Sequence, residues 1–245
     1  MKDAVVLAID AGNTRVKWGV HDGRSWRAVG AVATAEVKQL AHSIDAALPA
    51  DVAIASNVAG DAVQAAITAA CSAATLEVTF IRSPRAELGV INGYRDAQQL
   101  GPDRWAALVA ANALERGHKL VVNAGTALTI DALSADGKFL GGLIVPGPEL
   151  MRRSLDRGTA GLRLTEGAVD DFPQTTPDAI TSGAIQACAG AIERLGHAMV
   201  SHGTPPDRII LSGGAAAEIA PWLHLPSVHH ENLVLDGLAL IARHL

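Results

Sequence analysis

The chain has 245 residues, of which 49% are hydrophobic and 3% aromatic, and its formal net charge is −5. This length suits one large domain or two compact ones, and the hydrophobic content excludes a disordered or fibrous protein. No cluster of four or more Lys or Arg residues occurs, so nothing in the sequence indicates a nucleic-acid partner or a membrane-surface patch. Because no run of about 18 apolar residues occurs either, we expect no membrane-spanning helix.

The N-terminus and the cysteines indicate the cellular compartment. The apolar run at residues 4–9 is interrupted at Asp10, too early for a secretory leader. Cys71 and Cys188 belong to no CxxC or metal-ligand spacing, which is typical of buried cysteines in a reducing compartment. We therefore expect a cytoplasmic protein.

Hydrophobic patterns and turn residues predict the elements in chain order. In the first half we expect strands at 4–9, 15–20, 25–29, 52–55 and 76–81, and helices at 35–48, 61–73 and 103–116. A loop is expected over residues 83–100. Gly117 is expected to end the helix at 103–116. In the second half we expect strands at 120–123, 128–133, 139–145 and 208–211, and helices at 148–156, 176–202, after Gly214 and at 233–244.

Two stretches of the sequence resemble each other: IDAGNTRVKWGVHDG at 9–23 and VNAGTALTIDALSADG at 122–137. In both, a polar residue at the end of a strand precedes Ala-Gly and a Thr-bearing turn, and Asp-Gly closes the next hairpin. A true repeat predicts two α/β halves, residues 1–117 and 118–245, each of which begins with an antiparallel three-stranded meander. Chance similarity between two hairpins is the alternative.

The segment Asp10-Ala11-Gly12-Asn13-Thr14 lies between two strands, so it is no Walker A loop. A tight turn of this kind can still bind phosphate through its backbone N–H groups, because Gly12 allows a close approach. Asp10 is suited to hold Mg²⁺ through water, and Lys17 adds positive charge. With the second turn at Ala124-Gly125-Thr126, the pattern favours phosphate binding over an ordinary Asx-rich hairpin turn.

Two further motifs can carry chemistry. Gly101-Pro102-Asp103-Arg104 opens a predicted helix, where Asp103 is either a helix cap or a general base towards a hydroxyl, with Arg104 orienting an anionic group. Gly213-Gly214 between a strand and a helix allows a ring or ribose to lie against the backbone, although such junctions are common. The sequence leaves both alternatives open.

Other polar clusters are expected to be solvated. His224, His229 and His230 match no metal-binding spacing and are placed in a loop between helices. Asp170-Asp171 is likewise interpreted as part of a solvated loop.

Taken together and in order, these motifs resemble the type III pantothenate kinases of bacteria over nearly the whole chain. The resemblance is carried by Asp10–Thr14, Tyr94, Gly101–Arg104, Asn-Ala-Gly-Thr-Ala-Leu-Thr at 123–129, Gly-Gly-Leu-Ile-Val-Pro-Gly at 141–147, Thr176-x-x-Ala-Ile-x-Ser-Gly and Ser-Gly-Gly at 212–214. It implies the fold of the acetate kinase, sugar kinase, Hsp70 and actin superfamily: two actin-like (ribonuclease H-like) lobes, each a mixed five-stranded sheet with helices, and a cleft between them.

The resemblance also implies ATP-dependent phosphorylation of pantothenate, the first step of coenzyme A biosynthesis, by a homodimer that needs Mg²⁺ and a monovalent cation. Asp103 would be the general base. Pantothenate would contact Tyr94, Gly101, Pro102, Asp103, Arg104 and Thr176. ATP would bind Asp10, Ala11, Gly12, Asn13, Thr14, Arg15, Val16, Lys17, Thr126 and, near the adenosine, Gly213 and Gly214.

One position departs from the family pattern. The family usually has Asp, associated with K⁺ or NH₄⁺, where this chain has Asn123. An amide oxygen can still coordinate the cation but gives up a full charge, so weaker or absent cation dependence is expected. The alternative functions are another kinase of the superfamily, acting on a sugar or acetate-like substrate, and a non-enzymatic transcription accessory factor.

Overall fold

The structure, a computed structural model, describes residues 4–159 and 165–245. Residues 1–3, on which the expectation about a leader partly rests, lie outside this range. Contacts divide the chain into unit 1, formed by Met1–Glu115 and Asn232–Leu245, and unit 2, formed by Arg116–Glu231. Each unit is an α/β structure.

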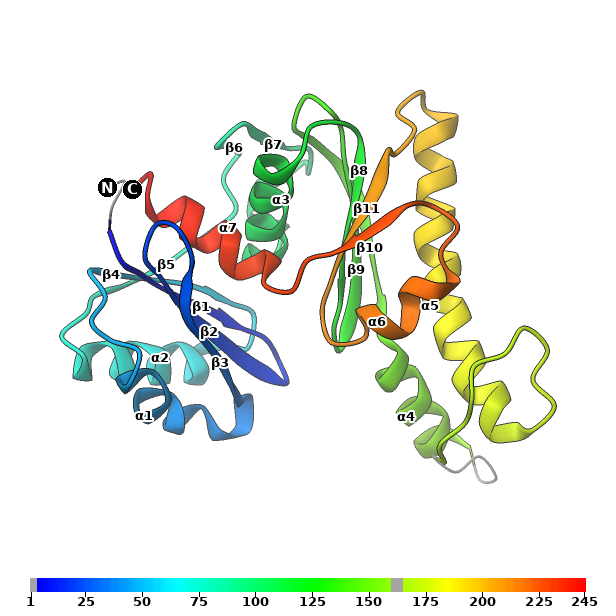
Figure 1. The fold of residues 1–245 in the computed structure, drawn as a ribbon, viewed down its shortest axis with the longest axis horizontal. Coiled ribbons are helices and arrows are strands. Elements are labelled where there is room, and N and C mark those ends of the chain that lie inside the picture. Colours follow the sequence, from blue (N-terminus) through cyan, green and yellow to red (C-terminus); the bar gives the residue numbers. More distant parts are fainter. Residues whose placement is uncertain (1–3, 160–164) are drawn as a thin grey trace. The chain divides into compact units, whose positions relative to one another are not determined.

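Unit 1 contains a five-stranded mixed sheet, coloured blue to cyan in Figure 1. Strands β1 to β3 form an antiparallel meander, and β4 and β5 continue in parallel beside β1, which gives the order β3-β2-β1-β4-β5. Their bounds are Val6–Ala11 (β1), Arg15–His21 (β2), Trp26–Ala33 (β3), Val52–Asn57 (β4) and Val78–Phe80 (β5).

Helices cover both faces of this sheet (Figure 1). Alternate side chains of each strand point to opposite faces, so Leu7, Ile9 and Ala11 pack into one core with the helices on their side. That side carries α1 (Leu40–Asp45), preceded by a 3₁₀ turn (Thr34–Gln39), and α2 (Asp61–Ala73). The other face carries α3 (Pro102–Leu114) and α7 (Leu233–Ala242).

The C-terminal helix belongs to unit 1, which differs from the expected division at residue 117 into two consecutive lobes. Helix α7 packs against α3 so closely that a Cβ atom on Gly237 would lie 1.9 Å from the Ala106 carbonyl oxygen. Nearly all faces of α7 carry its own buried apolar residues, which is typical of a buried helix. The chain therefore returns to its first half to bury this helix.

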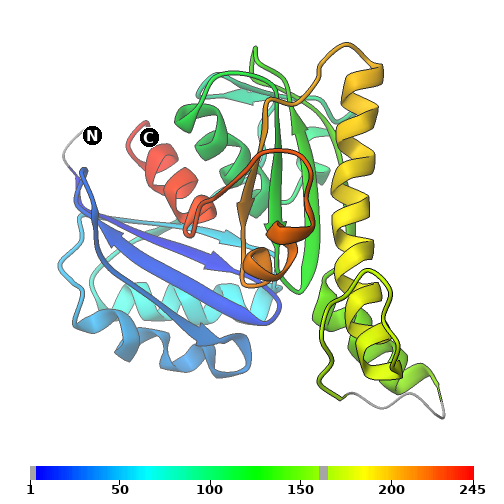
Figure 2. The same ribbon diagram turned by 45° about the vertical axis from the view of Figure 1, so that its right-hand side comes forward.

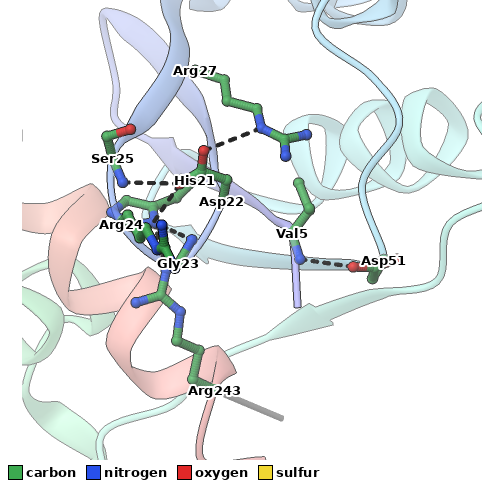
Figure 3. Close-up of polar contacts among 9 residues, drawn as sticks. All are labelled: Val5, His21, Asp22, Gly23, Arg24, Ser25, Arg27, Asp51 and Arg243. Atoms are coloured by element: carbon green, nitrogen blue, oxygen red, sulfur yellow. Dashed lines mark hydrogen bonds and ion pairs between the residues drawn. The ribbon is translucent and has the colours of Figure 1, made fainter. Parts of the chain in front are cut away.

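Polar contacts also tie the C-terminal segment to the β2–β3 hairpin (Figure 3). Arg243 contacts Nδ1 of His21, and Nε1 of Trp26 donates a hydrogen bond to Asp236 at 2.8 Å. In the hairpin turn, the Asp22 carboxylate accepts bonds from the next backbone N–H groups, and Gly23 has φ +98°. The predicted Asp-Gly hairpin is thus confirmed.

Unit 2 repeats the same strand pattern. Its strands β8 to β10 form an antiparallel meander, and β11 and β12 run parallel to β8 on its other side, which gives β12-β11-β8-β9-β10. The bounds are Lys119–Ala124 (β8), Ala127–Leu133 (β9), Lys138–Pro146 (β10), Arg208–Ser212 (β11) and Ser227–His229 (β12). The structure therefore confirms the internal repeat.

Helix α5 (Thr176–Ser201) packs along the sheet of unit 2, as the yellow helix in Figure 2 shows. It buries Ile185, Cys188 and Ile192 against β8 and β9. Helix α4 (Pro148–Gly158) follows β10, and α6 (Ala216–Ile219) with a 3₁₀ turn (Ala220–Trp222) follows β11.

Four details differ from the sequence-based expectation. The second sheet has seven strands rather than five, because the short strands β6 (Ala86–Glu87) and β7 (Val90–Asn92) extend the order beyond β10. They and a 3₁₀ turn (Ala97–Gln99) interrupt the expected loop at 83–100. The expected helix at 35–48 is split, and His229 lies on β12 rather than in a loop.

The predictions for the cysteines and for the absence of a membrane span can also be compared with the structure. Cys71 and Cys188 are both buried and free. Within residues 4–159 and 165–245, no helix combines the length and the apolar character needed to cross a bilayer.

Candidate active site

Three polar side chains form a row across the first sheet. In the strand register, Asp10 of β1 is paired with Lys17 of β2 on one side and with Ser56 of β4 on the other. Because the neighbouring Ile9 and Ala11 face the core on the α1–α2 side, the row lies on the opposite face, which α3 and α7 cover. The row therefore stands next to the phosphate-binding turn predicted from the sequence.

The turn after β1 is tightly hydrogen bonded. The Gly12 N–H donates to the Arg15 carbonyl at 3.0 Å, and Thr34 donates its N–H to the Thr14 carbonyl at 3.0 Å and its hydroxyl to the Gly12 carbonyl at 2.7 Å. Asn13, Thr14 and Arg15 are exposed at the tip, whereas Ala11 and Val16 are buried. Both of those residues have no exposed surface, backbone included, so the expected ATP contacts at Ala11 and Val16 are not offered by this turn.

The Asp10 carboxylate accepts a hydrogen bond at Oδ1 from the buried Ser56 hydroxyl at 2.7 Å. Burial raises the pKa of this carboxyl to about 6, and the nearby charge of Asp103 raises it as well, while Ser56 and Lys17 act in the opposite direction. The structure thus brings Asp10, Lys17 and Asp103 close enough to interact electrostatically. Two carboxylates in one neighbourhood favour a cation between them.

Asp103 lies in the first turn of α3, after Gly101 at the N-cap and Pro102 at the first helical position. Its carboxylate lies over Gly101, where an added Cβ would be 2.5 Å from Oδ1. Burial raises the pKa of Asp103, and hydrogen bonds from the Arg104 and Asp103 N–H groups and the charge of Arg104 limit this rise. The side chain thus contacts the helix start, as a cap does, while its raised pKa suits a general base.

Arg104 is nearly fully buried and is directed towards Tyr94. Its Nη1 atom donates to the Tyr94 hydroxyl at 3.2 Å, and its Cζ atom lies 5.7 Å from the centre of that ring. A buried guanidinium beside a phenol offers hydrogen-bond donors to an anionic or hydroxylated ligand. Tyr94, Gly101, Pro102, Asp103 and Arg104 are therefore neighbours in unit 1, as expected of one binding site.

Sequence reasoning missed the residues that support this site. Ser56 is the penultimate residue of β4 and pairs with Asp10 as Ser212 pairs with Asn123, so extending the comparison of the two halves to these strands could have found it. Arg85 and Asn92 organise the segment that carries Tyr94, but only the tertiary structure reveals it. Within the expected loop at 83–100, no motif or periodic pattern distinguished these two residues.

Unit 2 contains the equivalent row. Asn123 of β8 pairs with Thr129 of β9 and with Ser212 of β11, so a neutral set replaces Lys17, Asp10 and Ser56. The Ser212 hydroxyl makes a long bond of 3.4 Å to the Glu231 carbonyl. The row lacks the charges of the first one.

The second glycine turn resembles the first but is one residue shorter, because Ala124 pairs with Leu128 whereas Ala11 pairs with Val16. The Gly125 N–H donates to the Ala127 carbonyl at 3.0 Å, and the Gly147 N–H, directly after β10, donates to the Thr126 carbonyl at 2.8 Å. Gly213, with φ +98°, approaches the turn so closely that a Cβ would lie 2.5 Å from the Ala124 carbonyl oxygen. Thr126 and the Gly213-Gly214 turn are therefore brought together in unit 2.

Thr176 is exposed in the first turn of α5, also in unit 2. The preceding Thr175 is the N-cap, and its hydroxyl bonds the Asp178 carboxylate at 2.6 Å. Thr176 itself is thus not used for capping.

The donor set around Asp10 fits Mg²⁺ held mainly by phosphates and water. In the part of the chain that the structure describes, no group of three His, Cys, Asp or Glu residues could hold a metal ion. Ser56 occupies Oδ1 of Asp10, which leaves Oδ2 for a magnesium-bound water. Mg²⁺ is usually bound through one or two carboxylates, several waters and substrate phosphates, so these residues suit it.

The likeness to solved structures identifies the fold. The chain superposes with a TM-score of 0.62 on a Campylobacter jejuni protein described as a Baf family transcriptional activator, at 20% identity and covering 97% of this chain and 98% of the other. It also matches a Sinorhizobium meliloti protein described as a 2-dehydro-3-deoxygalactonokinase, with a TM-score of 0.58, 15% identity and coverage of 98% and 96%. These likenesses, with the repeated sheets, identify the actin-like fold of the sugar kinases.

Sequence relatives identify the family. Residues 6–198 match the family model described as type III pantothenate kinase. The chain is 46% identical over 239 residues to the type III pantothenate kinase of Aromatoleum aromaticum, with 98% of both chains covered. It is 45% identical over 240 residues to that of Nitrosospira multiformis, covering 98% of this chain and 91% of the relative. The chain therefore belongs to the type III pantothenate kinase family.

Proposed function

We propose that this chain transfers the γ-phosphoryl group of ATP to the primary hydroxyl of pantothenate, the first step of coenzyme A biosynthesis. The observation that carries the proposal is the pair of carboxylates Asp10 and Asp103, both with raised pKa, beside Lys17 and the phosphate-type turn. Phosphoryl transfer needs mainly positioning and charge neutralisation, and this constellation supplies both.

Asp103 acts as the general base. Its carboxylate accepts the hydroxyl proton while the hydroxyl oxygen forms a bond to the γ-phosphorus and the bond from that phosphorus to the ADP oxygen breaks. A carboxylate whose pKa lies above its ordinary value is a better proton acceptor near neutral pH. Arg104 and Tyr94 contact pantothenate together with the backbone of Gly101 and Pro102.

The nucleotide binds through turns of both halves. In unit 1, the residues that follow Gly12 offer backbone N–H groups to the phosphates, and the exposed Asn13 and Thr14 side chains add donors. Asp10 holds Mg²⁺ through water, and that ion, when bound, neutralises charge on the phosphate oxygens. In unit 2, Thr126 contacts phosphate, and the Gly213-Gly214 turn lies near the adenosine.

The remaining parts of the proposal concern the monovalent cation, the assembly and the compartment. Asn123 offers only a neutral amide oxygen, so we propose weak dependence on K⁺ or NH₄⁺. The chain forms a homodimer, in which Thr176 contacts pantothenate, and it works in the cytoplasm. The two buried, free cysteines are compatible with that reducing compartment.

A coupled assay of ADP release with ATP, Mg²⁺ and pantothenate tests this function. We expect turnover at sub-millimolar pantothenate and none with glucose, other sugars or acetate at the same concentration. Mass spectrometry should detect phosphorylated pantothenate in amounts equal to ADP. Turnover of a sugar without turnover of pantothenate would identify the chain as a sugar kinase, a class of enzyme whose fold it shares. Binding of ATP or pantothenate without any turnover would favour a non-enzymatic factor.

A further inference from the structure

The segment that connects β5 to α3 is organised around one guanidinium group. Arg85 donates from Nη1 to the Asn92 carbonyl at 3.1 Å and to the Tyr94 carbonyl at 2.6 Å, and from Nη2 to the Arg95 carbonyl at 2.9 Å. Three carbonyls within four residues thus point at one side chain. Arginine is suited to this, because its planar group presents five donors in a fixed geometry.

Asn92 completes the scaffold from inside. Its side chain is 1% exposed, and its Nδ2 atom donates to the Ala97 carbonyl at 3.1 Å and to the Pro84 carbonyl at 3.3 Å. Its Oδ1 atom accepts from the Tyr94 N–H at 3.1 Å, while its own N–H donates to the Arg85 carbonyl at 2.9 Å. The backbone of Tyr94 is therefore held on both sides, through its N–H by Asn92 and through its carbonyl by Arg85.

The held residue is the one that faces the site. With its backbone fixed, Tyr94 directs its hydroxyl to Nη1 of the buried Arg104 at 3.2 Å. Arg104 follows Asp103 directly on α3. A change in the path of residues 92–95 therefore moves the phenol relative to the arginine and the carboxylate.

We propose that Arg85 is a positioning residue that sets the affinity for the phosphoryl acceptor by holding Tyr94 against Arg104. The inference rests on the proposed function, since it concerns the same acceptor site. None of these three hydrogen bonds of Arg85 involves the phosphate-type turn or the Lys17-Asp10-Ser56 row. Removal of the Arg85 side chain is therefore expected to weaken binding of the acceptor and to leave binding of the nucleotide unchanged.

Steady-state kinetics with Arg85→Ala and Arg85→Lys test this role. We expect Arg85→Ala to raise KM for pantothenate about 10-fold, the loss that one charge-assisted hydrogen bond represents, with KM for ATP within about twofold of the parent. Arg85→Lys should be intermediate, because an ammonium keeps the charge but cannot bond three carbonyls together. Arg82→Ala, an exposed arginine three residues earlier, is the matched control and should change neither constant.

A double-mutant cycle tests whether Arg85 acts through Tyr94. Tyr94→Phe and Arg85→Ala should be non-additive, because each disturbs the same contact with Arg104. Additive effects, or equal increases of KM for ATP and pantothenate, would overturn the proposal and leave Arg85 a general stabilising residue.

Amide hydrogen exchange supplies a readout that needs no substrate. Arg85→Ala should accelerate exchange in residues 92–97 while the five strands of the first sheet keep their protection. If the parent protein fails to phosphorylate pantothenate, the proposed function fails, but exchange still decides whether Arg85 holds this segment. Unchanged exchange at 92–97 would overturn the inference whatever the activity is.

Discussion

The two halves of the molecule share a backbone pattern and differ in charge. Both begin with a meander whose first turn is covered by a residue after the third strand, Thr34 in one half and Gly147 in the other. The row beneath that turn is Lys17-Asp10-Ser56 in unit 1 and Thr129-Asn123-Ser212 in unit 2. The repeat thus supplies two glycine turns, but only unit 1 carries the charges that suit Mg²⁺.

The halves also differ in how their last strand reaches their last helix. In the second half of the sequence, only residues 230–232 separate β12 from α7, which belongs to unit 1. In unit 1, residues 81–101 separate β5 from α3, and this connection contains Arg85, Asn92 and Tyr94. We infer that the repeated frame serves the nucleotide, whereas the acceptor site depends on a connection present in one half only.

The largest loss of activity is expected at Asp103, at the start of α3, and the matched control is Asp236, at the start of α7. Asp103→Asn should lower kcat about 10²–10⁴-fold, because the base is lost, and leave ATP binding largely intact. Asp236 lies in the first turn of α7 and bonds Trp26, so Asp236→Asn should reduce thermal stability but change kcat less than about threefold. Steady-state kinetics and calorimetric ATP titration measure both; an Asp103→Asn enzyme with most of its kcat would remove Asp103 from the base role.

Asp10→Asn gives the first row the same central amide that the second row has at Asn123, while Lys17 stays in place. Because the pKa of Asp10 is raised from 3.8 to about 6 in the folded state, its stabilising contribution is present below about pH 4 and is lost as the pH rises through 6. The variant should therefore be more stable than the parent by about 1–3 kcal/mol at pH 8, with little difference at pH 4. Urea unfolding in metal-free buffer measures this.

Asp22 provides a control of opposite sign, because backbone hydrogen bonds from Ser25 and Arg24 lower its pKa to about 2. Its stabilising contribution is present above the unfolded pKa and is lost as the pH falls towards 2. Asp22→Asn should therefore lower stability at pH 8. An Asp10→Asn variant that is less stable at pH 8 than the parent would contradict the interpretation that a buried charge is tolerated for function.

The two serines test whether the rows differ in use as well as in charge. Ser56→Ala removes the hydrogen bond of 2.7 Å to Asp10 and should weaken Mg·ATP binding about 10-fold, with little change in binding of ATP without Mg²⁺. Ser212→Ala loses only a bond of 3.4 Å to a carbonyl and should change either affinity less than about threefold. Calorimetric titrations with and without Mg²⁺ compare them; equal losses in both variants would indicate that the rows are used alike.

Asn123→Asp gives the second row a carboxylate. We expect the parent rate to vary less than about threefold among Na⁺, K⁺ and NH₄⁺, since a neutral amide binds these ions weakly, and the variant to respond more strongly to K⁺. Initial rates with one monovalent cation at a time measure this. Strong K⁺ dependence of the parent enzyme would refute the prediction and show that Asn123 does not limit the cation's effect.

The local sequence was sufficient for the repeat and for the residues at its turns. Asp10–Thr14 and Asn123–Thr129 are contiguous, and their backbone chemistry is encoded by Gly12 and Gly125, so both turns and their strands could be predicted. The start of α3 was also encoded locally, by Pro102 after Gly101. Short signals failed: the three-residue strand β12 was not predicted, and the helix expected at 35–48 is split into a 3₁₀ turn and α1.

Contacts between residues that are distant along the chain could not be predicted from the sequence. Ser56 meets Asp10 only because β4 lies parallel to β1, and Arg85 meets the 92–95 carbonyls only because that segment folds back on it. Likewise α7 joins unit 1 because Gly237 allows contact with the α3 backbone at Ala106. The sequence by itself determined the two glycine turns and the helix start, because these depend on neighbouring residues. The tertiary structure decided the ionisation of Asp10 and the position of Tyr94, because burial and long-range hydrogen bonds exist only in the folded chain.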